Sequence, residues 1–299
     1  MSIADDILQL KKERNAIILA HNYQRGEVQD IADYVGDSFG LSQKAVQADA
    51  EVIVFCGVDF MAESAAILNP DKTVLLPTPE AGCPMARMIT PFDVQTLKFS
   101  HPDAEVVCYV NSSAAVKAVS DVCCTSSNAV KIVDSCKGDR VIFVPDRNLA
   151  SYVQKHTKKQ IFPWHGYCPT HEIITEGDVL IAKMDHPGAE VVVHPECRPE
   201  VVAIADGVFS TDGMLKYAKT TNKDLIIGTE MGIIHRLQKE NPGRNFFPIS
   251  QFVVCPNMKM NSLETVRDSL RDMKTRISVP EDIRIKAKRA LDRMLEVGR

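Results

Sequence analysis

The segment IILAHNYQRGEVQDIADYVGDS, residues 17–38, is the clearest indication of the fold because its pattern occurs three times in the chain. It begins with an apolar strand, continues through a polar turn and then forms a helix that ends at an aspartate. The segments VVCYVNSSAAVKAVSDVCCTS, ending at Ser126, and VVVHPECRPEVVAIADGVFST, ending at Thr211, follow the same pattern. Self-similarity of this kind is typical of a repeated structural unit. The chain is therefore predicted to contain three copies of one unit.

The second half of each copy adds an apolar strand, a helix and a further short strand, so each unit is predicted to be β-α-β-α-β, preceded by a helix. Strands that alternate with helices indicate parallel sheets covered on both faces. The predicted fold class is α/β, with three pseudo-symmetric three-layer αβα domains and parallel sheets around a central active site. The predicted domains are residues 1–86 together with the C-terminal residues 277–299, residues 87–171, and residues 172–276.

Polar residues recur at matching positions of the three copies, in a register set by Asp33, Asp121 and Asp206. In open α/β sheets, ligands bind beyond the carboxyl ends of the strands. One shared site is therefore expected there. Its residues are His21, Tyr109 and His194 in a first set, Tyr23, Asn111 and Glu196 in a second, and Ser38, Ser126 and Thr211 in a third.

This set of side chains suits a small polyanionic substrate, because hydroxyl, amide and imidazole groups can donate hydrogen bonds to carboxylates. Glu196, Tyr23 and the histidines can also move protons. A competing interpretation makes each histidine a structural hydrogen-bonding group and the third set helix caps.

A cysteine followed by proline also occurs once in each copy, at Cys83, Cys168 and Cys255. Three thiolates that meet at one axis need a cation to offset their repulsion. Zinc with three protein ligands and an open position is one option. A 4Fe–4S cluster with one iron open to substrate is another. The alternative is three buried thiols that act as small hydrophobic groups.

His171, which follows Cys168 closely, is predicted to lie beside the metal or to support its ligands. The remaining cysteines are interpreted as buried thiols, although a disulfide among them stays open. These are Cys56, Cys108, Cys123, Cys124, Cys136 and Cys197.

Composition excludes several classes of function. The chain has 299 residues, a net charge of −4 and 25% charged residues, without a basic stripe for nucleic acid or a membrane surface. Its N-terminus lacks the pattern of a signal peptide, and no run reaches the roughly 18 apolar residues of a membrane span. We expect a cytoplasmic protein. Phosphate-loop, dinucleotide-binding and zinc-protease motifs do not occur.

A series of short motifs extends through most of the chain. They are His21–Gln24, Asp30–Asp33, Gly36–Ser38, Gly57–Glu63, Tyr109–Ser112, Pro145–Leu149, His194–Cys197 and Gly228–Glu230. Together they resemble the quinolinate synthase A family, and the similarity extends from Ile17 to about Leu270.

The resemblance implies an enzyme of NAD biosynthesis that condenses iminoaspartate (iminosuccinate) with dihydroxyacetone phosphate to form quinolinate, phosphate and water. It implies a 4Fe–4S cluster on Cys83, Cys168 and Cys255, whose open iron acts as a Lewis acid. It also implies binding and catalytic roles for particular residues. The implied substrate-binding residues are His21, Ser38, Tyr109, Asn111, Ser126, His194, Glu196 and Thr211, and the implied catalytic residues are Glu196, Tyr23, His21, His194 and His171.

Two alternatives remain: a zinc-dependent lyase or hydrolase acting on a small dicarboxylate, and an iron–sulfur sensor without catalytic activity. The expected partners are the two small-molecule substrates, with a transient contact to the enzyme that supplies iminoaspartate. Neither nucleic acid nor a membrane is expected as a partner.

Overall fold

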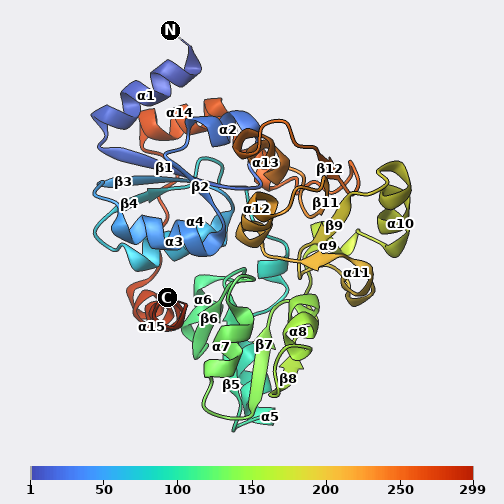
Figure 1. Cartoon of the computed structure of the whole chain (residues 1–299). Coiled ribbons are helices and arrows are strands. Elements are labelled where there is room, and N and C mark those ends of the chain that lie inside the picture. The colour runs from blue at the N-terminus through green and yellow to red at the C-terminus, as the bar shows by residue number, and fades with distance from the viewer. Residues whose placement is uncertain (1, 299) are drawn as a thin grey trace.

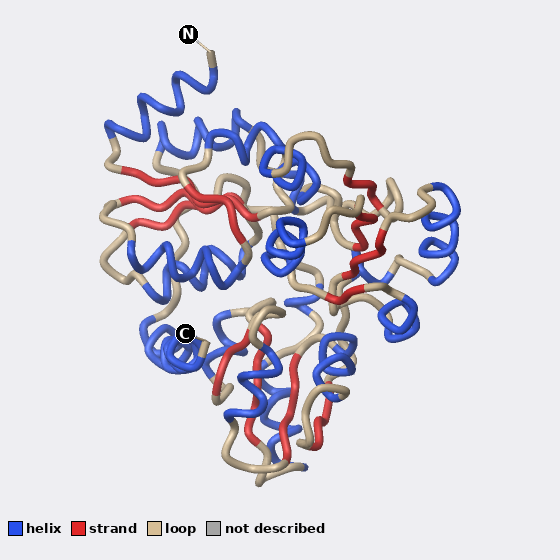
Figure 2. The backbone as a smooth tube through the Cα atoms, in the orientation of Figure 1, coloured by secondary structure: helices blue, strands red, loops and turns tan. Residues whose placement is uncertain are grey.

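The computed structural model describes residues 2–298 and forms three lobes, each built on one four-stranded parallel sheet (Figure 1). The strand orders are β2-β1-β3-β4, β6-β5-β7-β8 and β10-β9-β11-β12. The first strand of each unit therefore lies inside its sheet in all three lobes. In Figure 2, helices cover the strands of each lobe. The predicted α/β fold class, with three three-layer αβα domains built on parallel sheets, is confirmed.

The first lobe contains α1 (Ile3–Glu13), β1 (Ala16–His21), α2 (Gly26–Ile31), β2 (Tyr34–Gly36), α3 (Ser38–Gln47), β3 (Val52–Cys56), α4 (Asp59–Leu68) and β4 (Thr73–Leu75). The second contains η1 (Met85–Arg87), α5 (Pro91–Ser100), β5 (Glu105–Tyr109), α6 (Ala114–Ala118), β6 (Val122–Cys124), α7 (Ala129–Ser135), β7 (Arg140–Val144), α8 (Arg147–Gln154) and β8 (Gln160–Pro163). The third contains α9 (Pro169–Glu172), α10 (Glu176–Asp185), β9 (Glu190–Val193), α11 (Pro199–Ile204), β10 (Gly207–Val208), α12 (Thr211–Thr220), β11 (Leu225–Gly228), α13 (Ile233–Glu240) and β12 (Phe246–Pro248).

The chain then forms η2 (Met258–Met260), α14 (Leu263–Asp272) and α15 (Glu281–Val297). Helix α14 packs on α1 and β3 of the first lobe, with Val266 and Leu270 buried there. Helix α15 buries Ala287, Leu291 and Met294 and packs on α6, β6 and α4, so it joins the first two lobes (Figure 1). The predicted domain boundaries in residue numbers stay a prediction.

Each unit contains one strand more than the sequence analysis expected. The additional strands β2, β6 and β10 lie at the sheet edges and have two or three residues each. An edge strand pairs with one neighbour only, and such short strands lack the long apolar run that marks a buried strand. Asp33, Asp121 and Asp206 consequently lie just before these strands rather than at the ends of helices.

These three aspartates hold the sheets together in the same way. Each carboxylate accepts the backbone N–H of the central strand at 2.8 Å and pairs with a lysine of the helix that precedes the unit. The matching groups are Ile18–Asp33–Lys11, Val106–Asp121–Lys98 and Val191–Asp206–Lys183. Their recurrence shows that the repeat extends to individual hydrogen bonds.

The inner faces of all three sheets contribute to one buried core. Leu19 and Ile53 of the first sheet, Val107 of the second and Ile227 of the third belong to the same apolar cluster. The outer faces of the first and third sheets form separate clusters. The lobes are therefore packed against one another through apolar contacts, with their strands aimed at a common centre. No helix within residues 2–298 is long and apolar enough to cross a lipid bilayer.

Asp206→Ala should lower the free energy of unfolding by about 1–3 kcal/mol, because it leaves the buried N–H of Val191 without its acceptor. Urea unfolding followed by circular dichroism measures this change. Asp292→Ala is the matched control, since Asp292 and its lysine are exposed to the same degree as Asp206 and Lys183. It should cost about 0.5 kcal/mol or less. Equal losses in the two variants would contradict the proposed role of the aspartate.

Candidate active site

The three lobes enclose a central cavity of about 150 Å³. It lies where the carboxyl ends of the strands meet, as expected for parallel sheets. All the side chains that the sequence analysis proposed for the site line this cavity. They are His21, Tyr23, Ser38, Cys83, Tyr109, Asn111, Ser126, Cys168, His171, His194, Glu196, Thr211 and Cys255.

The first set sits at the carboxyl ends of the central strands. His21 ends β1, Tyr109 ends β5 and His194 directly follows β9. The Nδ1 atoms of His21 and His194 accept the backbone N–H two residues further on, at 3.2 and 3.3 Å. Nδ1 is thus an acceptor in both rings, and a neutral ring carries its proton on Nε2. In His194 that Nε2–H donates to Ser126 at 3.1 Å.

Burial lowers the pKa of both His21 and His194 to about 3. Both imidazoles are therefore neutral at pH 7. Burial opposes ionisation of Glu196 as well, but His171 beside it and a hydrogen bond from Tyr109 outweigh burial and lower the pKa of this carboxyl. Glu196 is consequently a buried carboxylate.

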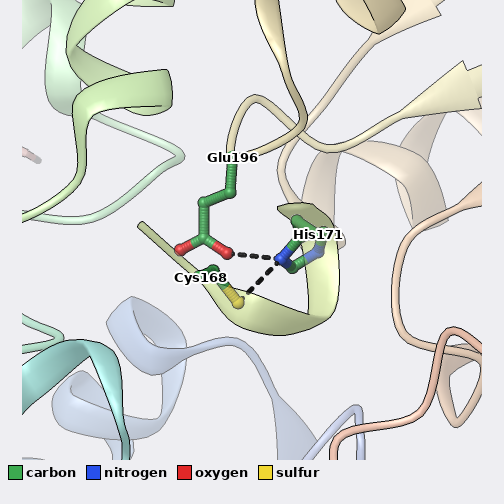
Figure 3. Close-up of side chains that lie close together, drawn as sticks. All are labelled: Cys168, His171 and Glu196. Atoms are coloured by element: carbon green, nitrogen blue, oxygen red, sulfur yellow. Dashed lines mark hydrogen bonds and ion pairs between the residues drawn. The ribbon is translucent and has the colours of Figure 1, made fainter. Parts of the chain in front are cut away.

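Cys168, His171 and Glu196 form the most compact group in the cavity (Figure 3). His171 Nδ1 lies 2.7 Å from Glu196 Oε2 and 3.1 Å from Cys168 Sγ. Pro169 begins the short helix α9, which places His171 one turn after Cys168 on the same side. The three ligand atoms lie within 4.8 Å of one another, so this group could also hold a metal ion.

Thr229 extends this group, and the sequence analysis did not propose it as a site residue. Its hydroxyl lies 2.7 Å from His171 Nε2 and 2.6 Å from Tyr23 Oη. Because Glu196 can only accept, His171 Nδ1 carries a proton and donates it to Glu196. Burial raises the pKa of Tyr23 well above its ordinary value, so its hydroxyl keeps its proton. Hydrogen bonds through Thr229 and His171 thus link Tyr23 to Glu196.

Sequence reasoning missed Thr229 because it counted polar residues only at the ends of the first strands. Thr229 follows β11, the third strand of its unit, whose carboxyl end reaches the same edge of the sheet. A search for polar residues directly after every predicted parallel strand, and not only after the first strand of each unit, would have found Thr229.

Two members of the third set lie at the starts of helices, and the other follows an edge strand. Ser38 and Thr211 are the first residues of α3 and α12, and Ser126 follows β6. The capping interpretation is wrong for Ser38 and Thr211, because the neighbouring Asp37 and Ser210 accept the helix N–H groups. The hydroxyls of Ser38 and Thr211 are therefore available to a ligand, whereas the Ser126 hydroxyl accepts from His194.

Two buried polar atoms at the cavity lack a hydrogen-bond partner within residues 2–298, Asn111 Oδ1 and Glu196 Oε1. Buried polar atoms are almost always satisfied in native proteins. Within the same described residues, no lysine or arginine lines the cavity. The geometry therefore fits a polar ligand held by hydroxyl, amide and imidazole groups.

Cys83, Cys168 and Cys255 are half-buried and face the cavity from different parts of the chain. All nine cysteines are free thiols, and the other six are buried, which confirms the interpretation of those six. Burial raises the pKa of Cys83 to about 12 and also raises the pKa of Cys168 and Cys255. A metal that binds these sulfurs must displace their protons. Three sulfurs that line one cavity fit a cluster with three cysteine ligands.

These features define a three-lobed α/β protein whose central site combines thiols, imidazoles and a buried carboxylate. Residues 5–296 match the family described as "Quinolinate synthetase A protein". The chain is 58% identical over 296 residues to the quinolinate synthase of a Dehalococcoides mccartyi strain, covering 99% of this chain and 98% of that protein.

Similar relatives occur in other organisms. Proteins named quinolinate synthase from Methanoregula boonei and Methanosarcina barkeri are 55% and 56% identical, and each comparison covers at least 97% of both chains. The chain therefore belongs to the quinolinate synthase A family, a family of enzymes. The resemblance stated from the motifs is confirmed.

His21→Asn should make the free energy of unfolding less dependent on pH below about pH 6.5. The pKa of His21 is about 3 in the folded state and near 6.5 when unfolded, so below pH 6.5 only the unfolded chain takes up the proton. Stability then falls with falling pH by up to about 1.4 kcal/mol per pH unit for such a histidine. Urea unfolding at several values between about pH 7.5 and about pH 5 measures the slope.

The control for this experiment is His156→Asn, at an exposed position. It should leave the slope unchanged. A His21→Asn slope equal to that of the unmodified protein would contradict the neutral buried imidazole.

Proposed function

We propose that this protein condenses iminoaspartate with dihydroxyacetone phosphate to form quinolinate, phosphate and water, as a step of NAD biosynthesis. The observation that carries the proposal is the single cavity lined by Cys83, Cys168 and Cys255 together with the polar residues of all three lobes. Membership of the quinolinate synthase A family supports the same reaction.

The three cysteines are proposed to hold a 4Fe–4S cluster. Four cysteines normally hold such a cluster, so three leave one iron open. When bound, the cluster would supply a Lewis acid that polarises an oxygen or nitrogen of the substrate. The donor set supports this proposal, because the three half-buried thiols face one cavity while the other cysteines are buried away from it.

The dicarboxylate substrate is proposed to bind to the hydroxyl groups of Ser38, Ser126 and Thr211 and to the amide of Asn111. Ser38 and Thr211 begin α3 and α12, so the partial positive ends of these helices face the bound carboxylates. This arrangement substitutes for the lysine or arginine that the described cavity wall lacks. The neutral His21 can donate from Nε2 to the same ligand, while His194 donates from Nε2 to the Ser126 hydroxyl and orients it.

Proton transfer is proposed to run through Tyr23 and Glu196. The condensation forms a C–C bond and a ring and loses water, so protons must leave carbon and nitrogen and reach departing oxygens. Glu196 Oε1 is unpartnered and ionised, and can therefore accept a proton from the substrate. Tyr23 keeps its proton and can donate it, while Thr229 and His171 orient these two groups.

A zinc-dependent lyase or hydrolase is the second candidate, because Cys168, His171 and Glu196 alone offer a sulfur, nitrogen and oxygen set of the kind that zinc accepts. Metal analysis of anaerobically purified protein distinguishes the two. Iron and sulfide with absorbance in the visible range support the cluster. A colourless zinc protein supports the alternative.

The proposal includes cellular context. Iminoaspartate is unstable in water, so a transient contact with the enzyme that supplies it is proposed, in the cytoplasm. Neither nucleic acid nor a membrane is proposed as a partner, in keeping with the net charge of −4.

The deciding experiment is an anaerobic assay for quinolinate with iminoaspartate and dihydroxyacetone phosphate. The unmodified protein should form quinolinate, and Cys83→Ala should lose the cluster and the activity. Cys136→Ala, which removes a buried thiol outside the cavity, should keep both. A brown, active Cys83→Ala protein would refute the ligand assignment.

Glu196→Gln should reduce turnover by about 100-fold or more, as expected for loss of an acid–base group, and should leave the visible absorbance unchanged. Glu172→Gln is the matched control. Glu172 pairs with Arg147 outside the cavity, so its substitution should leave turnover near that of the unmodified protein. Near-normal turnover of Glu196→Gln would remove Glu196 from the mechanism.

A further inference from the structure

The backbone N–H of each candidate ligand cysteine donates to a carboxylate from another loop. The N–H of Cys83 donates to Asp59 at 3.1 Å, and the N–H of Cys168 donates to Asp146 at 3.1 Å. In the third unit the N–H of Cys255 donates to Glu230 at 3.2 Å. The same contact occurs three times although one of the three acids is a glutamate.

These acids occupy equivalent places in the fold. Asp59 begins α4, Asp146 immediately precedes α8, and Glu230 follows β11 just before α13. Each lies after the third strand of its unit, and therefore at the same edge of the sheet as the cavity. The contact joins this edge to the cysteine loop that follows the fourth strand.

Each carboxylate also accepts a second backbone N–H at the start of the next helix. Asp59 accepts from Phe60 at 2.8 Å, and Asp146 accepts from Leu149 at 2.7 Å. Glu230 accepts from Gly232 at 2.8 Å. One side chain thus ties the cysteine loop to the rigid start of a helix.

Burial indicates that these acids have a specific purpose. Asp146 and Glu230 are fully buried, and a buried carboxylate is costly unless hydrogen bonds or a cation satisfy it. Glu230 pairs with Lys259 at 2.9 Å. Asp59 lies 3.4 Å from Arg87 and remains about a third exposed. Two buried carboxylates and a partly exposed third at the matching place are unexpected unless the cysteine loops need support.

Proline makes this support necessary. A proline follows each of the three cysteines and has no N–H to donate. The backbone N–H of the cysteine itself is then the nearest donor whose hydrogen bond can hold the cysteine backbone, and with it the sulfur, in position. Metal ligands must be held within about 0.5 Å of their working geometry, and hydrogen bonds from a second layer of residues normally do this.

We propose that Asp59, Asp146 and Glu230 are positioning residues that hold Cys83, Cys168 and Cys255 for the iron–sulfur cluster. The inference rests on the proposed function, because it concerns the cluster that the function requires. These three acids form a set distinct from the aspartates that accept hydrogen bonds from the central strands.

The test compares Asp146→Ala with Asp206→Ala, which removes a carboxylate-to-backbone bond of the same kind far from the cysteines. Both proteins are reconstituted anaerobically with iron and sulfide, and the loss of iron to EDTA is followed by visible absorbance. Asp146→Ala should lose iron about tenfold faster or more, the usual effect of removing a residue that supports a metal ligand. Asp206→Ala should lose iron at the rate of the unmodified protein.

Asp146→Asn supplies a conservative variant, since its amide oxygen can still accept the N–H of Cys168. Asp146→Asn should lose iron more slowly than Asp146→Ala. A variant effect that came only from lower overall stability would not explain this recovery. If Asp146→Ala does not fold by circular dichroism, Asp59→Ala decides the matter, because Asp59 is partly exposed. It should also lose iron faster than the unmodified protein.

Two results would overturn the inference. One is iron retention by the folded alanine variants equal to that of the unmodified protein. The other is an equally fast loss from Asp206→Ala. Failure of the unmodified protein to take up iron and sulfide would instead overturn the proposed function, so the two failures are distinguishable.

Discussion

The hydrogen bond between His171 Nδ1 and Glu196 Oε2, at 2.7 Å and almost fully buried, is the interaction on which the site depends. A carboxylate can stay ionised in a cavity without a lysine or arginine in its described wall only if donors surround it. His171 and Tyr109 provide these donors, and they come from different parts of the chain. Correct packing of the lobes is therefore a condition for the charge on Glu196.

The features that recur in all three units and the positions at which the units differ serve different purposes. Features that hold the structure recur in all three units, such as the aspartates before the edge strands and the acids beneath the cysteine loops. Features that carry chemistry differ between units. Glu196 occupies the position that Tyr23 and Asn111 hold in the other copies. One asymmetric substrate at a pseudo-threefold centre requires a different side chain at each equivalent position.

Much of the site could be predicted because the repeat sets the register of the first strands, and parallel strands end at one edge. Thr229 could not be found in this way, because its importance comes from contacts with Tyr23 and His171, which lie far away in the sequence. The edge strands β2, β6 and β10 escaped prediction for another reason. Two or three residues that pair on one side leave too weak a periodic signal.

Three α/β units, the order of most elements, the cysteines at matching positions and the polar residues that face the cavity could all be inferred from the order of the amino acids. Those are consequences of local periodicity and of the common direction of parallel strands. The packed lobes were needed to show which donor faces which acceptor, that His21 and His194 are neutral, and that Glu196 is ionised. Hydrogen bonds between lobes and loss of water arise when the lobes pack, and no single repeat contains that information.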